Sequence, residues 1–383
     1  MSEASSGTTP MAAPRWEYGS EFPWPVADED VTAPPLPGGA RLLSCGRDAL
    51  RSLVEHGRRR WGWRRIWIPT YICLDLVDAA RATGLATLAY PDGPGDGPAA
   101  GVALDFAPGD VLLVVNHFGI RTSPAMESLD RSAVVVIEDH THDPWSAWAA
   151  QSDADFAVAS LRKTLPLPDG AVLWSPRGEP LPPAPPVSRV RGLASQKKRD
   201  GMLLKSQYLQ GRDISKEAFR GLLVAGEQEL ALGEPSGMTP ESRALLDCLP
   251  VLPWRAVRQE NHRFLAARLA GASGVRLLTG AAPGACPFSA VVVFDTPGRR
   301  EFVRRRLIEQ NLYPAVLWPL DDALWTDIPA RHRDFSRCMI SLPCDMRYGR
   351  SDLERVAEAV ALASREYAGR RSAAESPSSE VQR

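Results

Sequence analysis

The sequence predicts an α/β fold with a large domain built on a mostly parallel sheet and a smaller C-terminal α/β domain. The chain has 383 residues, of which 44% are hydrophobic, enough for a large core and typical of two domains. Short apolar runs alternate with longer amphipathic ones, a pattern typical of parallel sheets buried on both faces. A proline-rich link starting at Pro180 and a polar helical region over 190–233 separate the two units.

Each element follows from the local pattern of apolar residues and turn signals. In the first unit we predict helices over Arg47–His56 and Leu74–Ala82. The strands expected there are Arg65–Ile68, Leu85–Tyr90, Val111–Asn116, Ala133–Ile137, Phe156–Ser160 and Ala171–Trp174. In the second unit we expect strands over Ser289–Phe294 and Ala315–Trp318, with helices over Arg299–Gln310 and Ser351–Ala363.

These elements place the large domain at 39–245 and the small domain at 246–368. Residues 1–38 are rich in Pro, Ala, Ser and acids, so we expect a disordered tail or an arm lying on the surface. Residues 369–383 are expected to form a second tail.

Composition excludes several classes of function. A net charge of -1 argues against nucleic acid as a partner, and the basic residues within 188–205 fit a solvated helix. No apolar run reaches the ~20 residues of a membrane span, and no secretory signal is visible, so a cytoplasmic protein is expected. The six cysteines form no CxxC pair and no zinc pattern, which favours reduced thiols and no metal.

Three features at strand or helix ends carry candidate chemistry. Gly46 opens a helix, whose N-terminal N–H groups suit a phosphate. Asp139 ends an apolar strand, where a carboxylate can keep a pyridinium nitrogen protonated. Ser160 ends another strand, and three residues later comes Lys163, a residue type that forms imines with aldehydes and shuttles protons. The carboxyl ends of parallel strands meet at one edge of a sheet, so these groups are expected to lie together.

Each feature also has an ordinary explanation. The glycine suits any turn before a helix, Asp139 can cap a loop or bind a metal, and Lys163 can be a solvated surface lysine. The Ser-x-x-Lys spacing also occurs in penicillin-binding enzymes, but their Ser-Asp-Asn and Lys-Thr-Gly motifs are absent.

The order and spacing of these motifs resemble fold-type I enzymes that use pyridoxal 5'-phosphate (PLP), which have the fold of aspartate aminotransferase. More narrowly, they resemble the DegT-type sugar aminotransferases. The resemblance covers residues 40–365. The matching segments are Ile68–Cys73, Val115–Gly119, Ile137–Asp139 with His142, and Ser341–Tyr348 followed by an acidic helix.

The resemblance implies roles for individual residues. Lys163 would carry the cofactor as a Schiff base, and Asp139 would face the ring nitrogen. Gly46, Arg47 and Ser160 would surround the phosphate. His142 stands where the family has a glutamine beside the phenolic oxygen of the cofactor. Tyr71 is the candidate aromatic shelf over the ring, although the usual aromatic aligns nearer Cys73.

Two further residues are candidates for substrate contact. Trp318 stands where the family has a substrate-facing residue, and it is otherwise a core side chain. Arg347 would bind a substrate carboxylate through a bidentate contact, or else form a structural ion pair with the following helix.

The sequence also departs from the family. The interval from Ser160 to Lys163 is shorter than usual, and Leu165–Gly170 replaces the family's Gly-Glu-Gly-Gly run. The asparagine–arginine segment that a neighbouring subunit lends to the site is not recognisable. A nucleotide-sugar substrate therefore does not follow from the resemblance.

These observations predict an aminotransferase that moves an amino group from an amino-acid donor to a keto or aldehyde acceptor, working as a homodimer. Two alternatives stay open. One is a PLP-dependent lyase, cyclase or oxidase in a biosynthetic pathway, which the altered loop after Lys163 suggests. The other is a non-catalytic regulatory or partner subunit with the same fold.

Overall fold

A seven-stranded sheet organises the first two thirds of the protein. The computed structural model describes residues 13–26, 32–96, 104–123, 129–280, 284–321 and 327–375. The strands run in the order β2-β8-β7-β6-β5-β3-β4, and only β8 runs antiparallel to its neighbours. The predicted mostly parallel sheet is therefore confirmed. Its strands are β2 (Arg41–Leu43), β3 (Arg65–Pro69), β4 (Ala86–Tyr90), β5 (Asp110–Val115), β6 (Val134–Asp139), β7 (Phe156–Ser160) and β8 (Ala171–Trp174).

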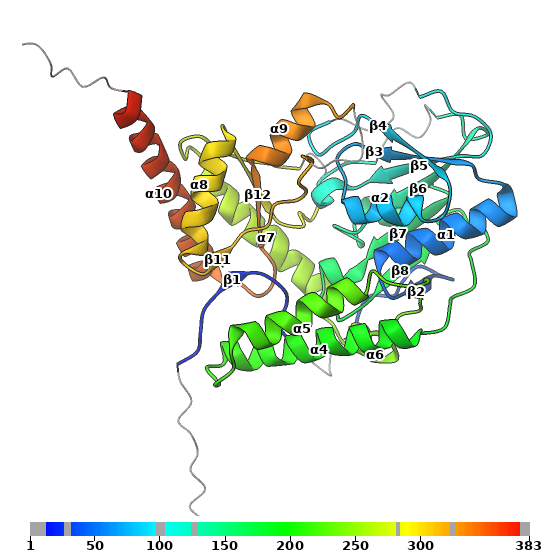
Figure 1. Cartoon of the computed structure of the whole chain (residues 1–383), viewed down its shortest axis with the longest axis horizontal. Helices are drawn as coiled ribbons and strands as arrows, with labels where there is room; N and C mark the ends of the chain where they lie inside the picture. The colour runs from blue at the N-terminus through cyan, green and yellow to red at the C-terminus, as the bar shows by residue number, and fades with distance from the viewer. Residues whose placement is uncertain are drawn as a thin grey trace, which may run out of the picture.

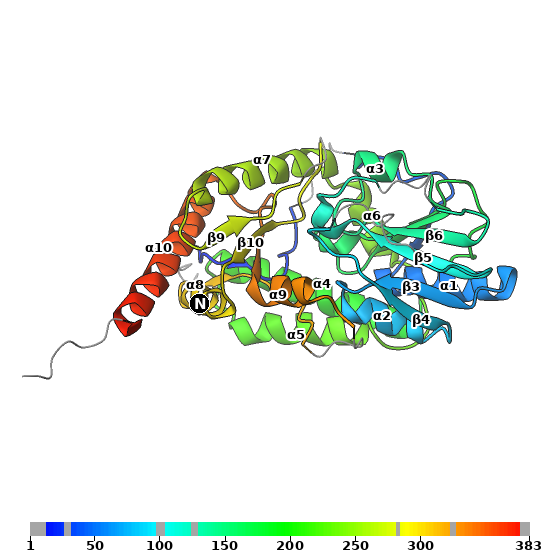
Figure 2. The same ribbon diagram turned by 90° about the horizontal axis from the view of Figure 1, so that it is seen from above.

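Helices cover both faces of this sheet, which explains why its strands read as continuous apolar runs. Figure 2 shows α1 and α2 on one side of the sheet, with α3 and α6 on the other. Side chains of β5 alternate between two cores: Leu113 packs with α1 and α2, while Leu112 packs with Trp148 of α3. The bounds are α1 (Gly46–Trp61), α2 (Leu74–Arg81), α3 (Ala147–Ala150) and α6 (Pro240–Asp247).

The C-terminal part is a smaller α/β layer around an antiparallel sheet of order β12-β10-β9. The long helix α7 (Val251–Leu269) leads into this layer. In the layer, α8 packs on β10 and β12, and α10 packs on α7 and α8. Beneath both parts runs the α4–α5 hairpin (Figure 1). The remaining bounds are α4 (Arg189–Leu209), α5 (Lys216–Glu229), β9 (Val275–Leu277), β10 (Ala290–Phe294), α8 (Pro297–Ile308), β11 (Leu312–Tyr313), α9 (Ala330–Cys338), β12 (Met339–Leu342) and α10 (Arg350–Glu375).

The structure differs from the predicted elements in two places. Residues 315–318 form no strand, because only Ala315 bridges to a neighbour, Ser341. The expected C-terminal tail begins later than predicted, since α10 continues to Glu375, and residues 376–383 lie outside the described residues.

The N-terminal arm is anchored to the rest of the protein at one point. Residues 1–12 and 27–31 lie outside the described residues; within residues 13–26 only Glu17, Tyr18 and Gly19 are buried, and the others are half-buried or exposed. The short strand β1 (Tyr18–Gly19) pairs in parallel with β11. The Tyr18 side chain is 0% exposed and lies in the core of the C-terminal layer, with its ring centroid 4.2 Å from that of Tyr348. The arm is therefore a structural element joined to the C-terminal layer.

No helix within the described ranges is long and apolar enough to cross a membrane. All six cysteines are free thiols.

We predict that Tyr18→Ala lowers the free energy of unfolding by about 3 kcal/mol, because it removes a large buried aromatic side chain. Urea denaturation followed by circular dichroism measures this. Val26→Ala on the same arm is the matched control, since Val26 is 93% exposed and its loss should change stability by less than about 0.5 kcal/mol. Equal, negligible effects would mean that the arm does not contribute to the folded core.

Candidate active site

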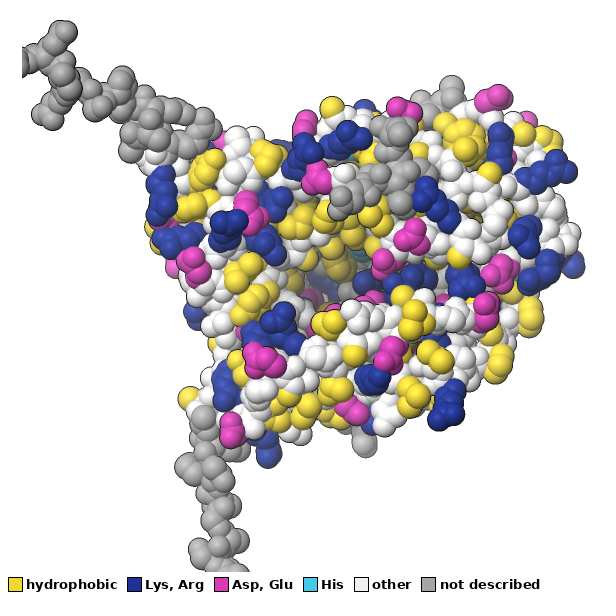
Figure 3. Space-filling model, viewed as in Figure 1, with side chains coloured by type: hydrophobic (Ala, Val, Ile, Leu, Met, Phe, Trp, Pro, Cys, Tyr) yellow, Lys and Arg dark blue, Asp and Glu magenta, His cyan; other side chains and the backbone are white. Residues whose placement is uncertain are grey.

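One cavity at the carboxyl edge of the large sheet collects most of the residues singled out from the sequence. Figure 3 shows a hollow on this face between the two parts of the protein. Gly46, Arg47, Asp139, His142, Ser160, Lys163 and Trp318 all line the cavity. Its wall also contains residues that the sequence did not single out: Thr141, Arg162, Phe288 and Leu317. Adjacent strands β6 and β7 end here, as the parallel topology requires.

Strand alternation decides which of the two carboxylates ending β6 faces the cavity. Glu138 points to the opposite face, where it is 0% exposed and accepts hydrogen bonds from Trp148 Nε1 (2.9 Å) and Ser152 Oγ (2.6 Å). Asp139, one residue on, therefore points to the cavity side. Its Oδ1 accepts the N–H of Thr141 at 2.8 Å, and burial raises the pKa of its carboxyl group.

The N-terminus of α1 and the end of β7 form a close cradle. A Cβ atom on Gly46 would lie 3.2 Å from the Cβ of Ser160, so glycine permits the close approach. Cys45, the N-cap, makes no side-chain hydrogen bond to α1, which leaves the first N–H groups of this 16-residue helix without a cap. The buried Oγ of Ser160 also has no hydrogen-bond partner. These unsatisfied groups together fit an anion such as a phosphate.

His142 presents a neutral ring to the cavity. The backbone N–H of Phe118 donates to His142 Nδ1 at 2.8 Å, so in the neutral ring the proton is on Nε2. Burial and the nearby Lys163 ammonium lower the pKa of His142 to about 3. The ring is stacked with that of Trp318, with centroids 5.8 Å apart. Nε2–H is thus available to donate to an acceptor in the cavity.

Lys163 lies at the end of a 3-10 helix, Leu161–Lys163, directly after β7. The positive charge of Arg162, together with burial, lowers the pKa of Lys163. The Lys163 side chain lines the cavity and is accessible to solvent through it. A larger share of neutral amine makes this lysine a better nucleophile than a surface lysine.

Glu227 of α5 balances the positive charge around Lys163. Its carboxylate accepts hydrogen bonds from Nη1 and Nη2 of Arg162, each at 2.6 Å, and from the ammonium of Lys198 at 2.9 Å. Burial alone would raise the pKa of Glu227, but Arg162 and Lys198 outweigh it and hold this pKa well below its usual range. Neither Arg162 nor Glu227 was predicted. Arg162 could have been noticed beside Lys163, whereas nothing local marks Glu227.

Asp169 anchors the loop after Lys163 through hydrogen bonds to two other segments of the chain. Its carboxylate accepts the N–H (3.0 Å) and the Oγ1–H (2.7 Å) of Thr239 and the hydroxyl of Ser195 (3.0 Å). These hydrogen bonds join the turn over Leu165–Gly170 to α4, through Ser195, and to the N-terminus of α6, through Thr239.

Two predicted site residues lie elsewhere. Tyr71 does not line the cavity: it is 0% exposed, packs edge-on against His117 and Phe335, and donates its hydroxyl proton to the carbonyl of Leu317. A ring held in this core has no free face for a cofactor. Cys73, where the family's aromatic aligns, does line the cavity.

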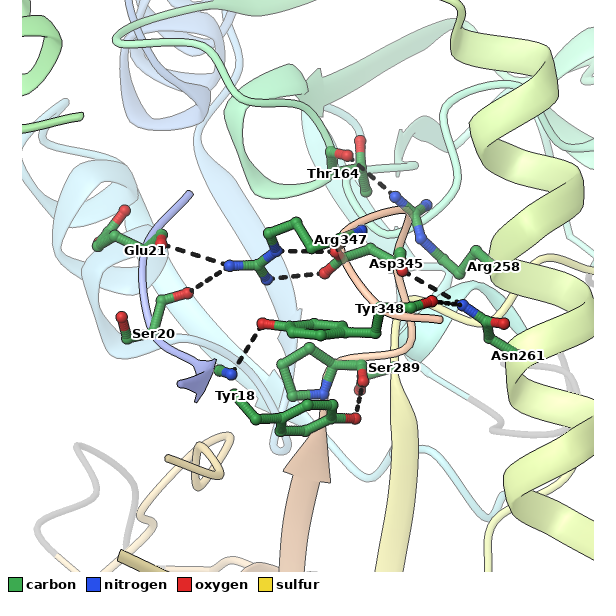
Figure 4. A network of polar contacts seen from close by, with 12 residues as sticks. Tyr18, Ser20, Glu21, Thr164, Arg258, Asn261, Ser289, Asp345, Arg347 and Tyr348 are labelled. Atoms are coloured by element: carbon green, nitrogen blue, oxygen red, sulfur yellow. Dashed lines mark hydrogen bonds and ion pairs between the residues drawn. The ribbon is translucent and has the colours of Figure 1, made fainter. Parts of the chain in front are cut away.

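Arg347 is engaged in a structural network (Figure 4). Its Nε and Nη2 donate to the two oxygens of Asp345 at 2.8 and 2.7 Å, and its Nη1 donates to the carbonyls of Ser20 and Glu21. It lines a second cavity, next to the first. The structural ion pair that the sequence offered as the alternative is present, made with Asp345 and not with the following helix, and the contact of Arg347 with a substrate carboxylate stays a prediction.

Searches with the sequence find no matching model of a protein family and no similar curated protein. The structure, by contrast, is similar to solved aminotransferases. The aminotransferase TlmJ from Streptoalloteichus hindustanus matches with a TM-score of 0.56 and 16% identity, covering 86% of each chain. The sugar aminotransferase CalS13 from Micromonospora echinospora matches with a TM-score of 0.54 and 15% identity, covering 84% of this chain and 87% of that one.

NtdA from Bacillus subtilis, solved with bound cofactor PMP, matches with a TM-score of 0.58 and 13% identity, covering 85% of this chain and 73% of that one. At these identities the similarities show the fold. The predicted aspartate-aminotransferase-like fold is confirmed.

We predict that Glu227→Gln lowers the free energy of unfolding at pH 7 by about 2 kcal/mol, because it leaves two buried cations without their shared partner. The depressed pKa of Glu227 fixes the pH dependence. The stabilisation is complete above the unfolded-state pKa of about 4.3 and is lost as the pH falls through the lower folded-state pKa. The difference between wild type and variant should therefore narrow below about pH 4.3.

Urea titrations at pH 7 and at acid pH test this. Glu241→Gln is the control, because Glu241 pairs with Arg199 at the surface and is 48% exposed, so its loss should cost under about 1 kcal/mol. A pH-independent difference for Glu227→Gln would contradict the ionic origin of the effect.

Proposed function

We propose that this protein is a PLP-dependent aminotransferase that moves an amino group from an amino-acid donor to a keto or aldehyde acceptor. The observation that carries the proposal is the joint presence, in one cavity, of Lys163, the buried carboxylate of Asp139 and the unpartnered Ser160 hydroxyl beside the N-terminus of α1. The fold similarity to aminotransferases supports the same reading.

The residues present fit the cofactor group by group. The unpartnered hydroxyl of Ser160, the uncapped N-terminus of α1 and the Arg47 side chain would hold its phosphate. Asp139, buried and without an ion pair in the part of the chain that the structure describes, would face the protonated ring nitrogen. The Nε2–H of His142 would donate to its phenolic oxygen. When bound, PLP supplies an electron sink for the carbanion formed at the substrate α-carbon.

The residues that line the cavity would each have a separate role in the reaction. Lys163, with its lowered pKa, would hold the cofactor through its aldehyde. As a free amine, the same side chain would be placed to move a proton between the substrate α-carbon and the C4′ carbon of the cofactor. An ionised Asp139 would keep the ring nitrogen protonated, because a carboxylate stabilises the charged form of a nearby base. Trp318 and Phe288 exclude water from the reacting atoms.

We predict that Lys163→Ala abolishes covalent attachment of PLP. Wild-type protein incubated with PLP and reduced with borohydride should carry a phosphopyridoxyl group on the peptide containing Lys163, as measured by mass spectrometry. Adding L-glutamate before reduction should discharge the lysine and leave the amine form of the cofactor. Lys205→Ala is the control, because burial also lowers the pKa of Lys205, to about 8, but Lys205 bonds to Ser20 and Glu21 and does not line the cavity around Asp139 and Ser160. Labelling of the Lys163→Ala variant at another lysine would overturn the assignment.

We predict that Asp139→Asn retains the cofactor but loses at least about 100-fold in the rate of the first half-reaction, because a neutral amide does not hold the ring nitrogen protonated. Stopped-flow absorbance with L-glutamate measures this rate. Asp139→Glu, which keeps the carboxylate, should recover part of the loss. An unchanged rate in Asp139→Asn would mean that the carboxylate does not contact the ring nitrogen.

A further inference from the structure

The turn that follows β5 contains a backbone conformation that is rare for a bulky residue. Phe118, in the 3-10 turn His117–Gly119, has φ 55° and ψ 13°, which is the left-handed region. Only two other residues with a Cβ atom share this region within the described ranges, Ser20 and Asn311. The conformation is unfavourable for any L-residue other than glycine, and it persists only where the surrounding structure imposes it. The strain at Phe118 therefore needs a cause.

Phe118 holds two walls of the active-site cavity through its own peptide groups. Its N–H donates to His142 Nδ1 at 2.8 Å, and its carbonyl accepts the N–H of Phe288 at 2.8 Å. Both partners line the cavity, whereas Phe118 does not. The relative direction of the N–H and the carbonyl of one residue is set by its φ and ψ angles. A right-handed Phe118 would therefore turn one of these two groups away from its partner.

The ring of Phe118 adds a second constraint on His142. It is 0% exposed and lies nearly parallel to the imidazole, with the centroids 5.6 Å apart and 4° between the planes. On Trp318 it is stacked at 6.3 Å and 12°. The hydrogen bond thus decides which nitrogen of His142 carries the proton, while the ring contacts limit the plane of the imidazole.

A buried ion pair behind the turn holds His117, the residue before Phe118. Arg121 donates Nη1 and Nη2 to the two carboxylate oxygens of Asp92, each at 2.8 Å, and its Nη1 also lies 3.1 Å from His117 Nδ1. Arginine only donates, so Nδ1 accepts, and the Nε2–H of His117 donates to the carbonyl of Tyr71 at 2.7 Å. Arg121 is 9% exposed and Asp92 is 1% exposed, so little solvent screens their attraction.

The residue after Phe118 joins the turn directly to the segment that carries His142. Gly119 has a φ of 68°, and a Cβ atom there would lie 2.5 Å from the carbonyl oxygen of Cys286 and 3.0 Å from that of His142. Only glycine permits this approach. Phe118 is therefore fixed between a residue held by an ion pair and a glycine packed against backbone.

We propose that Phe118 and the Arg121–Asp92 pair are positioning residues of the active site, which fix His142 as an Nε2–H donor of defined direction. None of the three lines the cavity, so their effect passes through His142 and Phe288. Retained backbone strain of this kind is typical of active sites. The inference rests on the proposed function for the target of that donor, the phenolic oxygen of the cofactor.

The first test measures the hydrogen bond itself, by NMR of the full-length protein labelled with ¹⁵N. Wild type is expected to show a scalar coupling between the Phe118 amide nitrogen and His142 Nδ1, and an imidazole protonated on Nε2. Arg121→Gln should lose the coupling and show both tautomers, because the turn is no longer held. Arg121→Lys keeps the charge opposite Asp92 and should recover the Nε2–H form in most molecules.

Arg131→Gln is the matched control and should keep the wild-type coupling, because Arg131 forms a similar pair with Asp155, at 2.7 Å, at the opposite edge of the sheet. The proposal is overturned if wild type shows no coupling, a result that needs no variant to fold. It is also overturned if Arg121→Gln keeps both the coupling and the single tautomer.

A second readout separates positioning from a general loss of structure. His142 would contact the phenolic oxygen and not the phosphate. Arg121→Gln should therefore bind PLP about 5-fold more weakly, the effect of one hydrogen bond, and bind inorganic phosphate as wild type does. Equal weakening of both ligands would contradict the proposal. If PLP does not attach to Lys163 in wild type, the proposed function fails, while the coupling in cofactor-free protein still decides whether Phe118 positions His142.

Discussion

The arrangement of positive charge around Lys163 depends on one carboxylate, that of Glu227. Arg162 and Lys163 directly follow β7, whereas Lys198 lies on α4, and all three positive charges lower the pKa of Glu227. Glu227 bonds directly to Arg162 and Lys198 from α5. Glu227 and Glu21, the latter 3.6 Å from the Lys198 ammonium, both favour the charged form of Lys163, but the positive charge of Arg162 and burial outweigh them, so the pKa of Lys163 is lowered. The same contact therefore stabilises the fold and leaves the lysine reactive.

Strand periodicity accounts for what the sequence predicts well. A period of two sends Glu138 into the core beside Trp148 and Asp139 into the cavity, and the paired register of β6 and β7 brings Asp139 to the same edge as Ser160. These relations are local or follow from parallel topology, so the apolar runs alone suffice to derive them. The six strands predicted for this unit accordingly match six of the seven strands of the sheet within a few residues, the short edge strand β2 being missed, and seven of the nine predicted site residues share one cavity.

Contacts between distant segments could not be predicted in this way. Tyr71 follows β3 and appears suited to cover a ring, but packing against Phe335 and the carbonyl of Leu317 draws it into the core. The prolines and acids of the arm predict a disordered tail or a surface arm, and they do not indicate that Tyr18 joins the core of the C-terminal layer beside a strand pair of two residues. Arg347 donates hydrogen bonds to the carbonyls of Ser20 and Glu21 in this arm, contacts that its local sequence does not indicate. No local pattern encodes partners that lie hundreds of residues away.

Unsatisfied buried polar groups then give the most direct description of what the cavities bind. A folded protein normally pairs its buried polar atoms, so each exception needs a cause. Two exceptions lie in the cavity that contains Lys163: the Ser160 hydroxyl has no partner, and the first N–H groups of α1 have no side-chain cap. Asp139, across the same cavity, has no ion pair among the described residues, and burial raises the pKa of its carboxyl group. An anion would satisfy the first two groups, and a cation beside Asp139 would stabilise its ionised form. The phosphate and the ring nitrogen of PLP are groups of these two kinds, which is why the cavity supports the proposed cofactor.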